Sequence, residues 1–288
     1  RDKMRLLNKS SGKQKQFLAF YEFKDKVDPE ELRQNLLKQG FQKKLLGTLI
    51  LAEEGINGSV IGAISDNQFL LDTLKNLNFN DLTINRYLTN SEAYDRFRIK
   101  IKKEIVTSEF NVARINKSSY IDPEKWDEEI KRHNMTIIDV RNFYESNIGS
   151  FQNSIKPMTH NFKEFKRVIT SQLAQHPREK PIGIFCTGGI RCEKAADFLN
   201  SQGFSSVHKL NGGILNYFKN NPQKRSLWSG DCFVFDKRVA INRRFECTNY
   251  QQCYGCKQMV RSNDRFESLD EWTLCTECKK LRNHNDKN

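Results

Sequence analysis

The sequence predicts a multidomain protein that combines α+β and α/β architecture with a small cysteine-rich module. Strand and helix patterns alternate in the order β-α-β-β-α-β over the first hundred residues. From about residue 134, short apolar runs alternate with helical patterns, and six of the eight cysteines follow residue 228. We therefore expect an N-terminal domain at 15–108, a linker at 109–132, an α/β domain at 133–227 and a cysteine-rich module at 228–288.

The N-terminal element order is typical of a ferredoxin-like sandwich. The first helix has clear end signals, because Asp28 can cap it, Pro29 suits its first turn and Gly40 closes it. Ser65 is the expected cap of the second helix. The last extended segment, 97–108, alternates apolar and basic residues.

That alternation places three basic side chains on one sheet face, because side chains in a strand alternate with a period of two. They are Arg98, Lys100 and Lys102. Such a face either holds a phosphate backbone or is simply solvated, and the residues alone leave both interpretations open.

The α/β domain is predicted from the runs "TIIDV" (136–140), "PIGIFC" (181–186) and "SVHKL" (206–210). Continuous apolar runs of this length are typical of buried parallel strands. Helical patterns follow at 161–176, 192–204 and 214–219, so we expect a parallel sheet covered by helices.

The stretch "CTGGIRC" follows the second buried run and directly precedes a helix. The positive end of a helix stabilises a thiolate and lowers its pKa. Two glycines allow backbone amides to point inward as an anion nest, and an arginine adds positive charge. The stretch thus predicts a nucleophilic Cys186 in a loop made of Thr187, Gly188, Gly189, Ile190, Arg191 and Cys192.

The size of this loop limits its chemistry. Cysteine phosphatases need five residues between cysteine and arginine, whereas four lie between Cys186 and Arg191. A tighter loop suits a single sulfur or oxygen atom and favours persulfide chemistry. The alternative is an inert core thiol. Cys192 either resolves an oxidised Cys186 or packs the helix, and Asp139 and Arg141 are expected to pair and brace the loop.

The C-terminal cysteines have zinc-ribbon spacing. Two Cys-x2-Cys pairs separated by 18 residues supply four thiolates for a tetrahedral structural zinc site: Cys253, Cys256, Cys275 and Cys278. Disulfides and redox-active pairs are the alternatives, Cys247 is a substitute ligand and Cys232 is expected to pack. Basic residues among aromatics suit unpaired RNA bases, and the net charge favours this interpretation over the rim of a small core; they include Arg243, Arg244 and Arg261.

Three segments together carry a family resemblance. "LAEEGINGS", "CTGGIRCEKA" and "FVFDKRV" resemble the rhodanese-containing tRNA uridine hydroxylases, and residues 130–225 resemble a rhodanese domain. The resemblance implies oxygen-dependent conversion of the wobble uridine, position 34, to 5-hydroxyuridine, with Cys186 as the active-site cysteine and a persulfide as its described intermediate. Ser150 departs from the pattern, because rhodanese domains usually carry histidine in that turn.

The expected function is therefore that of a tRNA-modifying oxidoreductase with molecular oxygen as co-substrate. The net charge of +13 agrees with a polyanionic partner, although a basic surface for solubility is the alternative. No flavin or nicotinamide motif and no membrane-spanning run is present, and free thiols favour the cytoplasm. A sulfurtransferase or persulfide carrier and a non-catalytic RNA-binding scaffold are the rival hypotheses. The oligomeric state and the electron donor do not follow from the residues.

Overall fold

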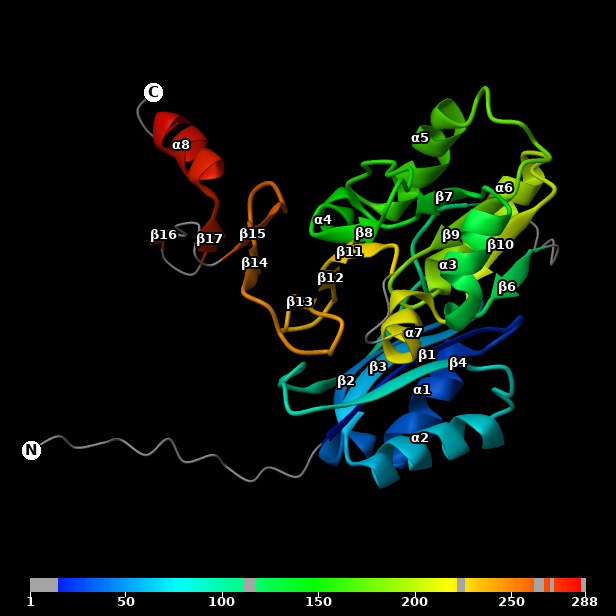
Figure 1. Cartoon of the computed structure of the whole chain (residues 1–288). Coiled ribbons are helices and arrows are strands. Elements are labelled where there is room, and N and C mark those ends of the chain that lie inside the picture. The colour runs from blue at the N-terminus through cyan, green and yellow to red at the C-terminus, as the bar shows by residue number, and fades with distance from the viewer. Residues whose placement is uncertain (1–14, 111–117, 222–225, 262–266, 270–271, 286–288) are drawn as a thin grey trace, which may run out of the picture.

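The computed structural model describes residues 15–110, 118–221, 226–261, 267–269 and 272–285. Figure 1 shows two larger domains stacked on one another, with the segment from β14 to α8 as a third body beside them. No helix in the described residues has the length and apolar character needed to cross a bilayer.

The N-terminal domain is one five-stranded sheet covered by two helices. Its elements are β1 (Lys15–Phe23), α1 (Pro29–Lys38), the 3-10 turn η1 (Phe41–Lys43), β2 (Leu46–Ala52), β3 (Gly55–Gly62), α2 (Ile64–Asn76), β4 (Thr83–Thr89) and β5 (Phe97–Ile101). The strand order is β4-β1-β3-β2-β5, with β5 parallel to β2 and the other neighbours antiparallel. This order confirms the ferredoxin-like prediction, and the extended segment expected at 97–108 supplies β5 as an edge strand.

The two helix N-termini test the capping residues that the sequence predicts. Asp28 accepts hydrogen bonds from the amides of Glu30 and Glu31, so the predicted cap of α1 is confirmed. The expected Ser65 cap of α2 is wrong. The amides of the first turn bond the Ala63 carbonyl, so the helix begins one residue before Ser65 and has no side-chain cap.

The two faces of this sheet have different partners. Leu18 and Phe20 of β1 pack beneath α1 and α2, whereas the alternate residues Phe17 and Ala19 belong to a separate cluster on the opposite face. Figure 1 shows both helices on the side away from the second domain. The helix-free face is therefore available to cover that domain.

The second domain has a parallel sheet, as predicted, in the order β6-β10-β9-β7. Alternate strand residues pack against α5 and α6 on one face and against α3 and α7 on the other. Its elements are β6 (Ser119–Ile121), α3 (Pro123–Arg132), β7 (Thr136–Asp139), α4 (Phe143–Ser146), β8 (Gly149–Phe151), η2 (Phe162–Glu164), α5 (Phe165–Gln172), β9 (Ile182–Phe185), α6 (Ile190–Ser201), β10 (Val207–Leu210) and α7 (Gly213–Asn220).

Both ends of this domain extend beyond the expected limits. The segment expected to be a linker contains β6 and α3. It belongs to the second domain, because β6 pairs with β10 at the edge of the parallel sheet. After residue 227, β11 pairs with β8. The C-terminal elements are β11 (Trp228–Gly230), β12 (Cys232–Phe233), β13 (Ala240–Ile241), β14 (Tyr250–Gln252), β15 (Met259–Arg261), β16 (Glu267–Leu269), β17 (Trp272–Leu274) and α8 (Thr276–Asn285).

Candidate active site

The Cys186 loop lies between β9 and α6, at the carboxyl end of the parallel sheet. Cys186 is only 1% exposed. The Gly189 amide donates to Cys186 Sγ at 3.1 Å, and Gly189 has a φ of 101°, which favours glycine. The first amides of α7, those of Ile214 and Leu215, hold the carbonyls of Cys186 and Thr187 at 3.0 and 3.1 Å. The loop therefore turns an amide toward the sulfur and anchors carbonyls on the neighbouring helix.

This setting favours the thiolate form of Cys186. Burial alone raises the pKa of the thiol, but a hydrogen bond from Cys192, the Arg191 charge and the amides of Arg191 and Gly189 outweigh it. The pKa of Cys186 falls to about 6, below the usual value of about 8.5. Burial and the hydrogen bond to Cys186 raise the pKa of Cys192 well above its usual value, so Cys192 stays protonated and donates.

Arg191 forms an ion pair with Glu145 in addition to its electrostatic effect on the cysteine loop. Its guanidinium forms two hydrogen bonds with Glu145 of α4, at 2.6 and 2.8 Å, and both side chains are buried. Glu145 also accepts from the Asn142 amide at 3.2 Å and completes a capping box at the start of α4. The arginine is thus a fixed strut between α6 and α4 as well as a source of positive potential.

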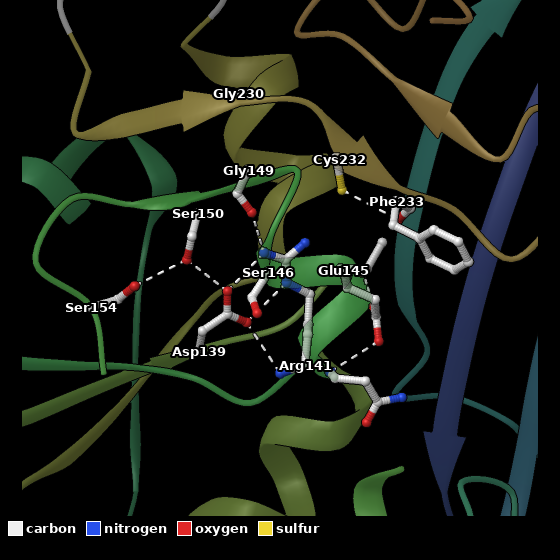
Figure 2. Close-up of polar contacts among 12 residues, drawn as sticks. Asp139, Arg141, Glu145, Ser146, Gly149, Ser150, Ser154, Gly230, Cys232 and Phe233 are labelled. Carbon is white, nitrogen blue, oxygen red and sulfur yellow. Dashed lines mark hydrogen bonds and ion pairs between the residues drawn. The ribbon is translucent and has the colours of Figure 1, made fainter. Parts of the chain in front are cut away.

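Asp139 and Arg141 form the expected pair. Arg141 donates to both carboxylate oxygens of Asp139, at 2.9 and 2.7 Å, and to the Gly149 carbonyl at 2.6 Å (Figure 2). The Ser150 hydroxyl donates to the same carboxylate at 2.7 Å. Trp228 of β11 lies over the Arg141 guanidinium, 5.2 Å from ring centroid to Cζ. The side-chain hydrogen bonds of the pair therefore fix β8, and in the described part of the chain none of them reaches the cysteine loop that the pair was expected to brace.

The helix-free face of the N-terminal sheet covers the loop. Asn85 of β4 donates to the carbonyls of Gly212 and Gly188 at 3.0 and 3.4 Å. Tyr21 of β1 donates to Glu193 of α6 at 3.0 Å. These contacts hold the two domains together directly at the candidate nucleophile.

A cleft of about 530 Å³ remains between the domains, and Cys186 lines it. This volume is within the range of small-molecule sites. Its walls include residues of β1, β2, β3 and β5, of the cysteine loop and of the segment after β12; among them are Ile50, Asn57, Lys100, Thr187 and Phe235. The activated thiol thus faces a space bounded by several separate parts of the chain.

Comparison with known proteins agrees with this architecture. Residues 15–105 match the UPF0176 acylphosphatase-like domain and residues 122–220 match the rhodanese-like domain. A tRNA uridine(34) hydroxylase of Picosynechococcus is 38% identical over 88% of this chain and 86% of that protein. One of Acinetobacter baumannii is 41% identical over 90% and 83%. The chain belongs to the tRNA uridine(34) hydroxylase family.

In this member of the hydroxylase family, the four C-terminal cysteines meet as predicted. The Sγ atoms of Cys253, Cys256, Cys275 and Cys278 all lie within 4.8 Å of one another. Four Zn–S bonds of about 2.3 Å in a tetrahedron give S–S edges of about 3.8 Å, and Cys256 and Cys275 are 3.8 Å apart. The donor set and spacing fit zinc. Cys247 is exposed and outside the cluster, while Cys232 is buried in the core.

The predicted basic residues do not form one patch. Arg98 and Lys100 of β5 pair with Thr48 and Ile50, whose face carries the cleft, and Lys100 itself lines the cleft. Lys102 follows β5 and is exposed. The other three lie in the C-terminal segment, where Arg243 donates to the Asn221 carbonyl, Arg244 is exposed and Arg261 donates to the Tyr250 hydroxyl at 3.1 Å.

Several residues of the site carry no local sequence signal. Glu145 and Asn85 act on the loop from other elements, and Tyr21 acts through Glu193. Phe235 lies in the segment "FVFDKRV" that carries the family resemblance, and that segment was the one available signal for it.

Proposed function

We propose that this protein hydroxylates the wobble uridine of tRNA to 5-hydroxyuridine and that Cys186 is the reacting nucleophile. The observation that carries the proposal is an activated thiol, with a pKa of about 6, lining an interdomain cleft of about 530 Å³. Family membership supplies the substrate, since the relatives are named tRNA uridine(34) hydroxylases.

Contact with tRNA is supported by charge on the cleft side of the sheet. Arg98 and Lys100 extend the face that bounds the cleft, at the edge strand β5. Phosphate contacts position an RNA, while unstacked loop bases are read by stacking and hydrogen bonds. The anticodon backbone would lie along this edge, with its wobble base turned into the cleft.

The proposed chemistry begins with addition of the Cys186 thiolate to C6 of the uracil, which makes C5 electron-rich. C5 then attacks an oxygen atom of an O–O bond. Loss of the C5 proton and of the thiolate restores the double bond and frees the enzyme. With molecular oxygen, one atom enters the base and the other leaves as water, so the balance needs two electrons from a donor such as a pair of thiols. A persulfide or sulfenic acid on Cys186 is the competing route.

The test uses tRNA containing 5-fluorouridine. Fluorine cannot leave C5 as a proton does, so the elimination that releases Cys186 is blocked. We expect a covalent protein–RNA adduct by mass spectrometry, mapped to Cys186 and absent in Cys186→Ser. Cys247→Ser is the matched control, because Cys247 is exposed and does not line the cleft. An active preparation that yields no adduct would contradict the C6 addition.

The sulfurtransferase alternative is supported by the short Cys186–Arg191 loop. A thiosulfate:cyanide assay, run beside nucleoside analysis of tRNA from a deletion strain, separates the two functions. Loss of 5-hydroxyuridine supports the hydroxylase. Normal tRNA together with strong sulfur transfer supports the carrier, and unchanged function of Cys186→Ser supports a scaffold.

Zinc completes the proposal as a structural ion bound by Cys253, Cys256, Cys275 and Cys278. Bound there, it would join two otherwise separate cysteine pairs and supply folding free energy to a module with a very small core. A cytoplasmic location is supported by the proposed tRNA substrate and by the free cysteines, and immunolocalisation tests it.

A further inference from the structure

The cleft has an exposed aromatic side chain in its wall. Phe235 is 63% exposed, the largest exposed fraction among the aromatic side chains of the described residues whose burial is given. It nevertheless lines the same cleft as Cys186. Its ring packs edge-on against buried Phe233, with centroids 5.0 Å apart, and the Arg191 guanidinium lies 5.6 Å from its centroid. Phe233 and Arg191 therefore contact one side of the Phe235 ring, while much of the ring faces solvent.

The exposure of Phe235 does not come from a loose backbone. The next residue, Asp236, forms a buried ion pair with Arg238, and Arg238 donates to the Tyr87 hydroxyl at 2.8 Å. The Lys237 amide donates to the Ala93 carbonyl at 3.0 Å. These contacts fasten the segment to the N-terminal domain at Tyr87 and Ala93. The chain thus holds an apolar ring in water at a fixed place, which costs free energy unless a ligand covers it.

Across the cleft, Asn57 of β3 offers an oriented polar group. Its side-chain nitrogen donates to the Ile105 carbonyl at 3.0 Å. Within the described residues no other hydrogen bond to this side chain is found, so Oδ1 remains available as an acceptor. A flip of the amide that put nitrogen in the place of Oδ1 would break the bond to Ile105, so the oxygen keeps its position.

We propose that this cleft is a uracil-binding pocket in which Phe235 stacks on the base and Asn57 Oδ1 accepts the N3–H. Uracil carries a proton on N3, whereas cytosine has an acceptor at that position. Asn57 would therefore favour uridine over cytidine at the same place in the RNA, since a buried acceptor facing an acceptor is strongly disfavoured. The inference rests on the proposed function for its substrate.

Binding tests the stacking without relying on hydroxylation. The probe is an anticodon stem-loop RNA with either uridine or an abasic nucleotide at position 34. Stacking of a base on an aromatic side chain corresponds to about 5- to 150-fold in affinity. We expect the wild-type protein to lose affinity within that range for the abasic RNA. Phe235→Ala should bind both RNAs equally and weakly, while Phe235→Trp should keep the difference.

The matched control for Phe235 is Phe69→Ala. Phe69 is 40% exposed but lies on α2, on the far face of the sheet. It should leave both affinities unchanged. Equal wild-type affinity for uridine and abasic RNA overturns the pocket, even when 5-hydroxyuridine is formed. If the wild type binds the uridine RNA more tightly than the abasic RNA but forms no 5-hydroxyuridine, the proposed function is wrong and the uracil-binding pocket is still supported.

The Asn57 part is tested by specificity. Full-length tRNAs with uridine or cytidine at position 34 are compared as substrates. We expect the wild type to prefer uridine, and Asn57→Ala to reduce the ratio of the two kcat/KM values at least tenfold. A purely structural role would lower both values in parallel and leave the ratio unchanged, which would overturn the assignment. Ser59→Ala is the comparison variant for this ratio. Ser59 lines the same cleft, but its hydroxyl bonds Tyr94, so its loss should not change the preference for uridine over cytidine.

Discussion

Arg191 binds both carboxylate oxygens of Glu145, at 2.6 and 2.8 Å, across the interior between α6 and α4. This relationship fixes the end of the cysteine loop to a part of the chain 46 residues away. It also balances the arginine charge, so the electrostatic support of Cys186 is shared among the arginine, the loop amides and the Cys192 thiol.

Removing one partner of this ion pair is expected to be costly. Glu145→Gln leaves the Arg191 guanidinium buried without its counter-charge, which destabilises a protein by about 3–5 kcal/mol. Urea unfolding measures the change. Glu277→Gln is the control, because the Glu277–Lys280 pair is exposed and such pairs contribute about 0–1 kcal/mol. Equal effects of the two substitutions would contradict the role of the strut.

The pH dependence of Cys186 alkylation follows from its depressed pKa. The thiolate forms as the pH rises, so the iodoacetamide rate should increase through a midpoint of about pH 6 and be nearly flat above neutrality. An ordinary thiol has its midpoint at about pH 8.5. Mass spectrometry of the peptide containing Cys186 measures the rate, with Cys186→Ser as the blank. A midpoint at the ordinary value would remove the electrostatic basis of the proposed chemistry.

Gly213 is expected to tolerate no side chain. A Cβ there would lie 2.5 Å from the Cys186 carbonyl oxygen and 2.8 Å from the Gly189 nitrogen. Gly213→Ala should displace the loop, and a shift of about 1 Å at a reacting group costs on the order of 100-fold in rate. The readout is 5-hydroxyuridine formed per minute.

Gly203→Ala is the control for that substitution. Gly203 also has a positive φ, 88°, but a Cβ there meets no atom within 4 Å. The variant should lose about 1 kcal/mol of stability through backbone strain and keep its activity. Loss of activity in both variants would mean that strain, not displacement of the loop, is responsible.

Chelation is expected to affect only the C-terminal module. Because metal binding supplies folding free energy to small metal-bound units, removal of the proposed zinc ion should open the segment from Tyr250 to Asn285. Limited proteolysis with a chelator should then cut within that segment and spare the two larger domains. Cys253→Ser should behave in the same way without chelator. An unchanged cleavage pattern would contradict a structural metal.

Local patterns were sufficient for the parts whose chemistry is local. The heptapeptide Cys186–Cys192 predicts its own loop, because the strand end, glycines and helix start are consecutive. The Cys-x2-Cys spacings likewise predict a cluster, since each pair forms its own turn. The ferredoxin-like order followed from periodicity, and the sheet order confirmed it.

Long-range relationships left no such pattern. The strand β6 has three residues and pairs with β10 about ninety positions later, so nothing around it distinguishes it from a connector. Glu145 meets Arg191 only when the second domain folds, and Asn85 and Tyr21 reach the loop and α6 only when the two domains meet. The Ser65 cap failed because the first turn used the Ala63 carbonyl instead.

The position of the segment after β12 affects the order in which the active site forms during synthesis. The cleft takes walls from residues as early as Phe17 and as late as Asp236. A nascent chain that has released the N-terminal domain and the parallel sheet from the ribosome therefore still has an incomplete site until the segment after β12 emerges and docks. A fragment that ends at Phe233 would keep β11 and β12 but would lack the last wall of the cleft, so we expect it to be inactive.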